Sequence, residues 1–180
     1  MNNEIKYEKL TYDNLDIATA IQNEIFKDEN GRTNYIEAIE KDPYRKEMEY
    51  YIAYVGDKPV GVTGIYVYHE YPTDAWLGWF GVLEKYRNHG YGGKILDKTI
   101  SLAKEKGYKN FRLYTDEYAT DAHKLYSSKG LIKELYDNQD DKDLYIEADI
   151  YIYSKSLTNS PVSLWNNKNI GIKEQSEKEH

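Results

Sequence analysis

The sequence has no cysteine, only 4 prolines among its 180 residues, and no long hydrophobic run. The absence of cysteine excludes disulfides, thiolate zinc sites and a cysteine nucleophile. The 4 histidines are too widely spaced to indicate a metal cluster, so we predict no bound metal. A membrane-spanning helix needs about 18 consecutive apolar residues and a signal peptide needs an apolar core, and neither pattern occurs. We therefore expect a cytoplasmic protein with no membrane partner.

Apolar residues make up 40% of the chain and aromatic residues 14%, which is enough for a hydrophobic core, while 31% charged residues can supply a solvated surface. The length predicts one ordinary domain with at most a small appendage. Acidic residues outnumber basic ones by 31 to 24, which gives a net charge of -7. Because such a chain repels phosphate backbones and anionic lipids, we expect no nucleic-acid partner.

Hydrophobic periodicity and turn residues predict the element order βααβββαβαββ. The expected helices cover 14–26, a short segment after Thr33, 92–106 and 120–129, and the expected strands after the first one cover 50–55, 60–68, 75–82, 111–115, 131–136 and 144–153. Hairpins mixed with strand-helix-strand crossovers predict an α/β (α+β) fold, with one mixed central β-sheet and helices on both faces.

The composition changes after residue 154, where polar residues become dominant. We therefore expect a domain over 1–154 and a polar C-terminal tail over 155–180. Apolar residues in the tail, such as Trp165, allow it to dock onto the domain or to form a homodimer.

One segment carries a clear chemical signal, between the expected strand 75–82 and the expected helix 92–106. It reads Arg87-Asn88-His89-Gly90-Tyr91-Gly92 and is followed by Gly93. Backbone N–H groups in the first turn of a helix point outward, the helix dipole favours an anion there, and glycines let phosphate oxygens approach closely. Between residues 84 and 109 basic residues outnumber acidic ones by 7 to 3. The segment predicts a phosphate-binding loop, although similar turns also occur as simple tight connections.

Arg87 to Gly92 match the R-x-x-G-x-G signature of the GNAT superfamily of N-acetyltransferases, which this segment resembles. A second segment, 122–131, resembles the family's A-x-x-L-Y-x-x-x-G-F pattern and follows the first after one expected strand. Two motifs in the family's order make the resemblance specific. It covers Ile5 to Tyr153 at the level of the fold, whereas its sequence signature is confined to 76–131.

The resemblance implies acetyl-CoA as the cosubstrate, with its pyrophosphate held by Arg87, Asn88, His89, Gly90, Tyr91, Gly92 and Gly93. It assigns the pantetheine arm to the backbone of Gly81 and Val82, where an N–H group can polarise the thioester carbonyl. It makes Tyr126 the general acid that protonates the departing thiolate, a role that suits a phenol neutral at pH 7. Ala119 replaces an asparagine of the family, so that one cofactor contact should be missing or replaced by a neighbour.

No motif fixes the general base. The candidates are Glu70 and Asp116, together with Glu117, and each of them also fits a solvated surface charge. His123, on the same expected helix as Tyr126, is interpreted as an ordinary surface histidine.

We expect an N-acetyltransferase, an acyltransferase that moves the acetyl group of acetyl-CoA to the primary amine of a small molecule by direct attack in a ternary complex. Acidic residues predominate over 134–149, which favours a cationic acceptor, while a loop that merely keeps the protein soluble explains the same pattern. Two alternatives stay open, namely a protein or peptide N-acetyltransferase and a non-catalytic acyl-CoA-binding regulatory module.

Overall fold

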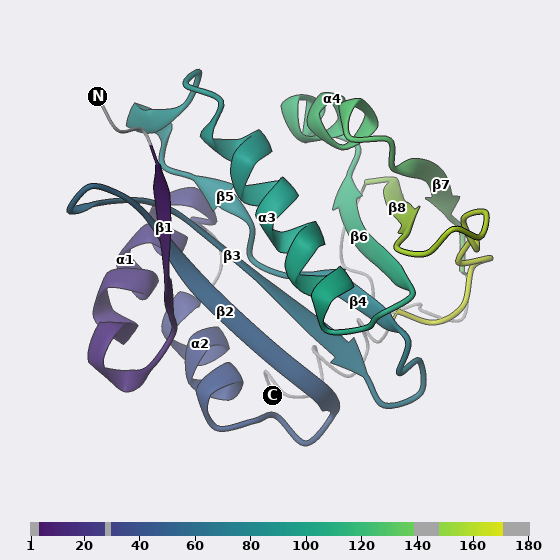
Figure 1. The fold of residues 1–180 in the computed structure, drawn as a ribbon, viewed down its shortest axis with the longest axis horizontal. Helices are drawn as coiled ribbons and strands as arrows, with labels where there is room; N and C mark the ends of the chain where they lie inside the picture. The colour runs from purple at the N-terminus through teal and green to yellow at the C-terminus, as the bar shows by residue number, and fades with distance from the viewer. Residues whose placement is uncertain (1–3, 28–29, 139–147, 171–180) are drawn as a thin grey trace. The chain divides into compact units, whose positions relative to one another are not determined.

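The computed structural model describes residues 4–27, 30–138 and 148–170. It divides into two compact units, Met1–Phe111 and Arg112–His180. The first unit holds β1 (Ile5–Lys9), the 3-10 turn η1 (Tyr12–Asn14), α1 (Leu15–Ile25), α2 (Gly31–Ile39), β2 (Arg45–Val55), β3 (Lys58–Tyr68), β4 (Asp74–Leu77), β5 (Gly81–Val82), η2 (Glu84–Tyr86) and α3 (Tyr91–Glu105). The chain enters the second unit within β6 (Asn110–Asp116), and there follow α4 (Thr120–Ser128), β7 (Ile132–Tyr136) and β8 (Ile150–Ser156) (Figure 1). The expected α/β class of fold is confirmed.

The helices begin and end at their local sequence signals. At the start of η1, which leads directly into α1, the Thr11 side chain accepts a hydrogen bond from the Asp13 N–H, while the Asn14 side chain accepts one from the Thr11 N–H. This reciprocal capping satisfies donors that a helix start otherwise leaves without a partner. At the end of α3, Gly107 has the left-handed backbone of a C-cap residue, with φ at 89°. The expected helices over 14–26, 92–106 and 120–129 are confirmed, and α2 is the expected short helix.

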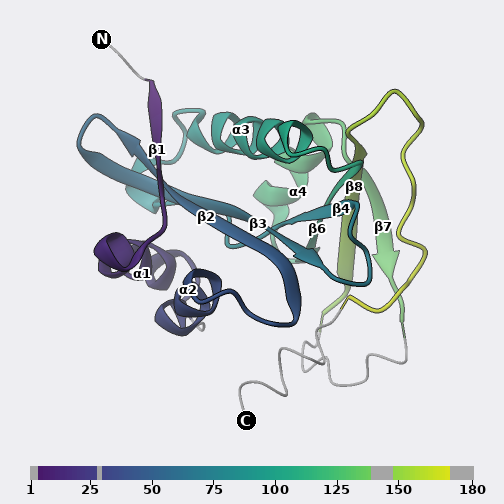
Figure 2. The ribbon, with the colours of Figure 1, turned by 60° about the horizontal axis from the view of Figure 1, so that its bottom comes forward.

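The sheet of the first unit carries helices on both of its faces. β1 pairs antiparallel with β2, which pairs antiparallel with β3 in the expected hairpin. The consecutive residues Ile52 and Ala53 are both fully buried, but Ile52 packs with side chains of α1 and α2, whereas Ala53 packs with Ile95 of α3. Because side chains alternate along a strand, α1 and α2 cover one face and α3 covers the other (Figure 2).

The continuous strand predicted over 75–82 is wrong, because the chain breaks it into β4 and β5. Leu77 stands opposite Ile65 and Gly81 stands opposite Val62, so the interrupted strand contains one residue more than β3 between these pairs. Trp79, within the interruption, has a left-handed backbone with φ at 45°. These are the features of a β-bulge, which bends a strand and changes the direction of its main-chain groups.

In the second unit, β8 pairs antiparallel with β7 and lies next to β6. The chain beyond β8 packs into this unit, since Trp165 and Ile170 are both fully buried. The guanidinium of the buried Arg112 donates to the Ser154 hydroxyl and to the Ser163 carbonyl, both at 2.7 Å. The strand expected over 144–153 begins outside the described residues, and its described part extends to Ser156.

Candidate functional site

A 3-10 turn and an exposed loop connect β5 to α3. Two residues of this connection, Asn88 and Gly90, have left-handed backbones with φ at 66° and 79°. A side chain with a Cβ disfavours this conformation by about 1–2 kcal/mol, a cost that glycine avoids. Gly90 is also the N-cap of α3, where it provides no side-chain acceptor for the first turn. The first donors of α3 are therefore left for another partner.

The backbone N–H groups from Asn88 to Gly93 form a consecutive run of donors. No residue in the described ranges accepts a hydrogen bond from any of them. The next donor, the Lys94 N–H, bonds to the Gly90 carbonyl at 3.3 Å. The run stands at the positive end of a helix of 15 residues, so it can bind the oxygens of a diphosphate.

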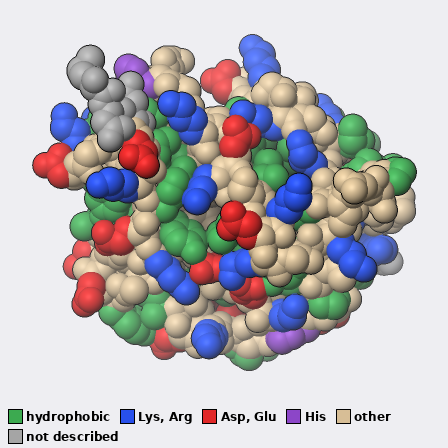
Figure 3. All heavy atoms as spheres, viewed as in Figure 1, with side chains coloured by type: hydrophobic (Ala, Val, Ile, Leu, Met, Phe, Trp, Pro, Cys, Tyr) green, Lys and Arg blue, Asp and Glu red, His purple; other side chains and the backbone are tan. Residues whose placement is uncertain are grey.

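Basic side chains accompany this helix. Figure 3 shows Lys and Arg side chains spread over the face that α3 covers, with acidic side chains among them. Lys94 and Lys98 are exposed on α3 itself. Tyr91 is partly buried and packs against the core beneath α3, so it offers the loop its backbone N–H, while its ring covers apolar side chains.

Arg87 is tied to the strand that precedes the loop. Its Nε donates to the Val82 carbonyl across 3.0 Å. The Arg87 side chain is otherwise exposed, and its terminal nitrogens have no partner among the residues the structure describes. The guanidinium is thus fixed at one edge and presents its other donors beside the loop.

The two residues expected to bind pantetheine differ in how their main-chain groups are used. β5 pairs with β3 and, within the described part of the chain, with no other strand. The Leu83 N–H donates to the Val60 carbonyl at 2.9 Å, and Gly81 stands opposite Val62. Because hydrogen-bonded and non-bonded pairs alternate in an antiparallel ladder, Gly81 belongs to a bonded pair. The N–H and carbonyl of Val82 therefore point away from β3.

Tyr126 belongs to α4 in the second unit, whereas the loop belongs to the first unit. Its side chain is buried, and its ring lies against the ring of Tyr153 with centroids 5.4 Å apart. Burial, with a smaller contribution from Tyr153, raises the pKa of Tyr126 above its usual value. The phenol is therefore protonated at neutral pH and can donate its proton.

The interpretation of His123 as an ordinary surface residue is wrong. Its Nδ1 lies 2.6 Å from the Tyr153 hydroxyl and its Nε2 lies 2.7 Å from the Asp116 carbonyl. The imidazole therefore joins α4 to both β6 and β8. The spacing of three residues between His123 and Tyr126, which places both on one helix face, is the signal that could have indicated this role.

The structure describes the surroundings of both candidate bases, Glu70 and Asp116. Glu70 is exposed in the turn between β3 and β4, at the opposite end of β4 from Val82. The Asp116 carboxylate accepts from the N–H groups of Tyr118 and Ala119, at 2.8 and 3.2 Å. It thereby closes the turn before α4, a structural role that was not predicted from the sequence.

Most of the acidic residues between 134 and 149 lie at 139–147, outside the described residues. Of the described ones, Asp149 donates its backbone N–H to the carboxylate of Glu117, which lies outside this segment, at 3.1 Å. Glu134 accepts from the backbone N–H groups of Trp165 and Asn166, at 2.7 and 3.1 Å. The Glu134 carboxylate thus anchors the C-terminal segment of the second unit.

The described residues contain neither a metal-binding cluster nor a membrane-spanning helix. No group of three or more acidic or histidine side chains there has an arrangement that could hold a metal ion. In the same part of the chain, every helix is too short or too polar to cross a membrane.

Fold and motifs together define the class of this protein. The family model described as the acetyltransferase (GNAT) family matches residues 15–131, well over half of the chain, and its match includes the loop and Tyr126. The chain belongs to this family, as its two motifs predicted. Proteins of the family use acetyl-CoA as their cosubstrate. A comparison with curated protein sequences found no match.

Solved structures of similar fold share little sequence with the chain. The ribosomal-protein-S18-alanine N-acetyltransferase of Escherichia coli is 16% identical, with a TM-score of 0.69, and the match covers 90% of this chain and 99% of that one. A GNAT family acetyltransferase of Elizabethkingia anophelis, solved with acetyl-CoA bound, is 22% identical, with a TM-score of 0.62 and coverage of 86% and 99%. NAA60 of Arabidopsis thaliana, solved with a bisubstrate analogue, is 13% identical, with a TM-score of 0.65 and coverage of 85% and 98%. These identities establish a shared fold alone.

Proposed function

We propose that the protein is an acetyl-CoA-dependent N-acetyltransferase whose acceptor is the primary amine of a small cationic molecule. The observation that carries the proposal is the run of backbone donors from Asn88 to Gly93, in a chain of the acetyltransferase (GNAT) family. Direct attack of an amine on a thioester requires no nucleophile from the protein, and the chain has no cysteine that could serve as one.

The loop residues fit the diphosphate of acetyl-CoA. A Cβ built at Gly90 meets no atom within 4 Å, so the space beside this backbone is open. Consecutive N–H donors, the positive end of α3 and the terminal nitrogens of Arg87 all complement negatively charged oxygens. We assign the diphosphate to the segment from Arg87 to Gly93, chiefly through its main chain.

When bound, acetyl-CoA supplies an acetyl group that is activated as a thioester. We assign to the Val82 N–H, which points away from β3, the pairing with the pantetheine arm and the polarisation of the acetyl carbonyl. We assign to the Tyr126 hydroxyl, which its raised pKa keeps protonated, the delivery of a proton to the leaving sulfur. Because Glu70 lies at the far end of β4 and Asp116 closes a turn, we propose that water takes the proton of the attacking ammonium group.

The preference for a cationic small molecule depends on the acidic character of residues 134–149. A protein or peptide amine is the second candidate acceptor, because the similar Escherichia coli structure is an N-acetyltransferase for an alanine of a ribosomal protein. Spermidine and a lysine-rich peptide, offered separately with acetyl-CoA, distinguish the two acceptor classes through the release of free thiol.

Thermal unfolding of the purified protein with acetyl-CoA, CoA or ATP tests the cofactor assignment. A ligand at about 100 times its Kd adds about 2.7 kcal/mol to the unfolding free energy. We expect the Tm to rise with acetyl-CoA and with CoA but not with ATP. An unchanged Tm at saturating acetyl-CoA would contradict the proposed function, and a rise without thiol release from any amine would favour the regulatory module.

A further inference from the structure

Tyr153 of β8 lies between two side chains of α4 in the second unit. Its ring centroid is 5.5 Å from that of His123 and 5.4 Å from that of Tyr126. It is fully buried, with 0% of its surface exposed. His123 and Tyr126 follow the three-residue spacing that places side chains on one helix face. The elements that carry these residues, α4 and β8, lie side by side in Figures 1 and 2.

The hydrogen bonds of His123 define its tautomer. The Asp116 carbonyl can only accept, so the Nε2 atom 2.7 Å away carries the proton. In the neutral ring, Nδ1 is then an acceptor, and the Tyr153 hydroxyl 2.6 Å away donates to it. The hydroxyl proton of Tyr153 therefore points to His123.

This bond fixes the Tyr153 ring at its polar end. The ring is thus held at its hydroxyl by a side chain of α4. The ring of Tyr126 lies against this immobilised surface, with an angle of 57° between the two planes.

We propose that His123 is a positioning residue for Tyr126. By accepting the hydrogen bond of the Tyr153 hydroxyl, it fixes the ring that orients Tyr126. The inference rests on the proposed function, in which Tyr126 donates the proton to the leaving thiolate. Its importance follows from geometry, since a displacement of about 1 Å in a reacting group can cost about 100-fold in rate.

Two substitutions at His123 separate its two hydrogen bonds. His123→Asn places an amide oxygen close to the position of Nδ1, so it keeps an acceptor for Tyr153 and loses the contact with Asp116. His123→Gln places its amide nitrogen close to the position of Nε2, so it keeps the contact with Asp116 and loses Tyr153. Tyr153→Phe keeps the ring and removes only the hydroxyl.

The first readout does not depend on activity. In protein with 13C-labelled tyrosine rings, the NMR signals of Tyr126 are identified by their loss in Tyr126→Phe. We expect the chemical shifts of these signals to change in His123→Gln and in Tyr153→Phe, and to be unchanged in His123→Asn. A merely structural role for the imidazole predicts the same displacement for both His123 variants.

The second readout is steady-state acetyl transfer to spermidine or to the lysine-rich peptide. In His123→Gln and Tyr153→Phe, kcat should fall by about 10-fold to 100-fold while the KM for acetyl-CoA is unchanged. His123→Asn should retain most of the kcat of the unmodified protein. Unmoved Tyr126 signals in His123→Gln, or equal losses in the Asn and Gln variants, would overturn the positioning role. If the unmodified protein acetylates neither amine, the proposed function fails, and the Tyr126 signals then decide the positioning role by themselves.

Discussion

The side chain of Arg87 hydrogen-bonds the main chain of Val82, with 3.0 Å between its Nε and the carbonyl oxygen. The contact joins the start of the donor-rich loop to β5. It orients the planar guanidinium, so that one edge is used by the protein and the other is left for a ligand. The same contact occupies the carbonyl of Val82, which leaves the N–H of this residue as its available group.

Arg87→Lys should weaken acetyl-CoA binding about tenfold, because an ammonium cannot bond the Val82 carbonyl and present a planar pair of donors at the same time. The unfolding free energy should change little, since Arg87 is exposed. Isothermal titration calorimetry with acetyl-CoA measures the change. Arg32→Lys is the matched control, because Arg32 is an exposed arginine that pairs with Asp16 on another part of the first unit. Equal affinities of the two variants would contradict the assignment of Arg87.

Gly92→Asp should reduce acetyl-CoA affinity more than 100-fold, because a carboxylate in the first turn of α3 obstructs and repels a diphosphate. Ser101→Asp adds the same charge at an exposed position of the same helix and should bind acetyl-CoA as the unmodified protein does. Ligand-dependent shifts in Tm compare the two variants at equal acetyl-CoA concentration. A similar loss in both would mean that net charge, and not the loop, controls binding.

Tyr126→Phe should lower kcat by about 100-fold or more, the usual contribution of a general acid, while acetyl-CoA affinity stays within about threefold. The phenyl ring keeps its packing on Tyr153, so folding should be preserved. Tyr118→Phe is the control, because the Tyr118 side chain is 71% exposed. Thiol release and calorimetry separate the two effects, and a parallel loss of kcat and affinity would argue against the role of Tyr126.

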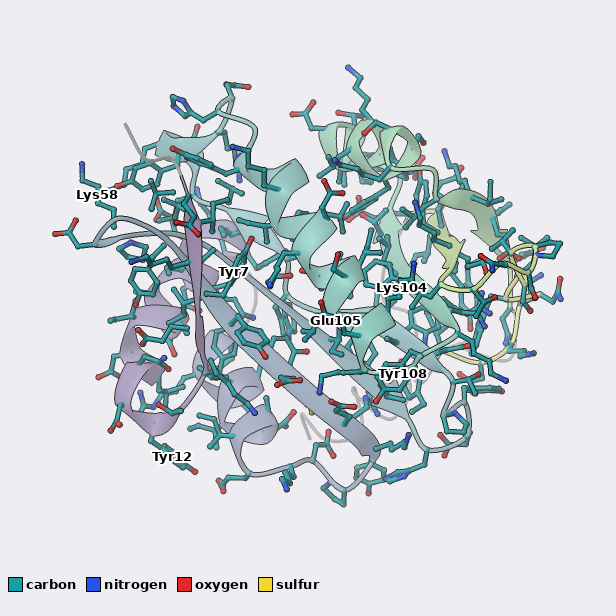
Figure 4. All side chains as sticks on the ribbon, viewed as in Figure 1. Tyr7, Tyr12, Lys58, Lys104, Glu105 and Tyr108 are labelled. Atoms are coloured by element: carbon teal, nitrogen blue, oxygen red, sulfur yellow. The ribbon has the colours of Figure 1, made fainter. Side chains whose placement is uncertain are left out.

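A charged cluster on the α3 side of the first unit should make stability depend on pH. The Glu49 carboxylate contacts the Lys106 ammonium at 2.6 Å and accepts from the Tyr51 hydroxyl at 2.8 Å. Burial by itself would raise the pKa of Glu49, but the hydrogen bonds from Lys106 and Tyr51 outweigh it and lower the pKa below 4.5. Lys106 also contacts Glu47, which accepts a hydrogen bond from Tyr108, the residue labelled beyond the end of α3 in Figure 4.

A carboxylate with a lowered pKa in the folded state stabilises the fold above its unfolded pKa, and this contribution disappears as the pH falls through the folded pKa. The unfolding free energy should therefore decline below pH 4.5. Glu49→Gln should be less stable than the unmodified protein at neutral pH and should lose less stability on acidification. Urea unfolding across this pH range tests the prediction, with the exposed Glu105 on the last turn of α3 changed to Gln as the control (Figure 4). Parallel pH profiles of the two variants would refute it.

Trp165→Ala should destabilise the second unit by about 3–5 kcal/mol, the usual cost of removing a fully buried large aromatic side chain. The indole also donates to the Lys168 carbonyl at 2.7 Å, and the guanidinium of Arg112 lies over its ring at 5.2 Å. Leu164→Ala, at a neighbouring residue that is 40% exposed, should cost less than about 1 kcal/mol. Denaturant unfolding compares them, and equal stabilities would mean that the C-terminal segment contributes little to the fold.

Local sequence patterns were sufficient for most of the helices and for the first hairpin. The apolar stripe of α1 and the left-handed Gly107 after α3 act over a few residues, so they can be identified without any tertiary contact. The loop from Arg87 to Gly93 was also identified locally, because helix-start donors and glycines are properties of consecutive residues. The bulge at Trp79 was not identified from the sequence, because it depends on which residues of β3 stand opposite the residues of β4 and β5.

The sequence by itself determined the order of the elements apart from the break between β4 and β5, the position of the loop before α3 and the family of the protein, because each is encoded in runs of adjacent residues. The tertiary structure decided which polar groups meet. It placed the His123 ring between the Asp116 carbonyl and the hydroxyl of Tyr153, which lies 30 residues after His123 in the chain. It also placed the Glu134 carboxylate where it accepts a hydrogen bond from the backbone N–H of Trp165. The physical reason is that a hydrogen bond between distant segments depends on the packing of whole elements, which no local pattern of residues specifies.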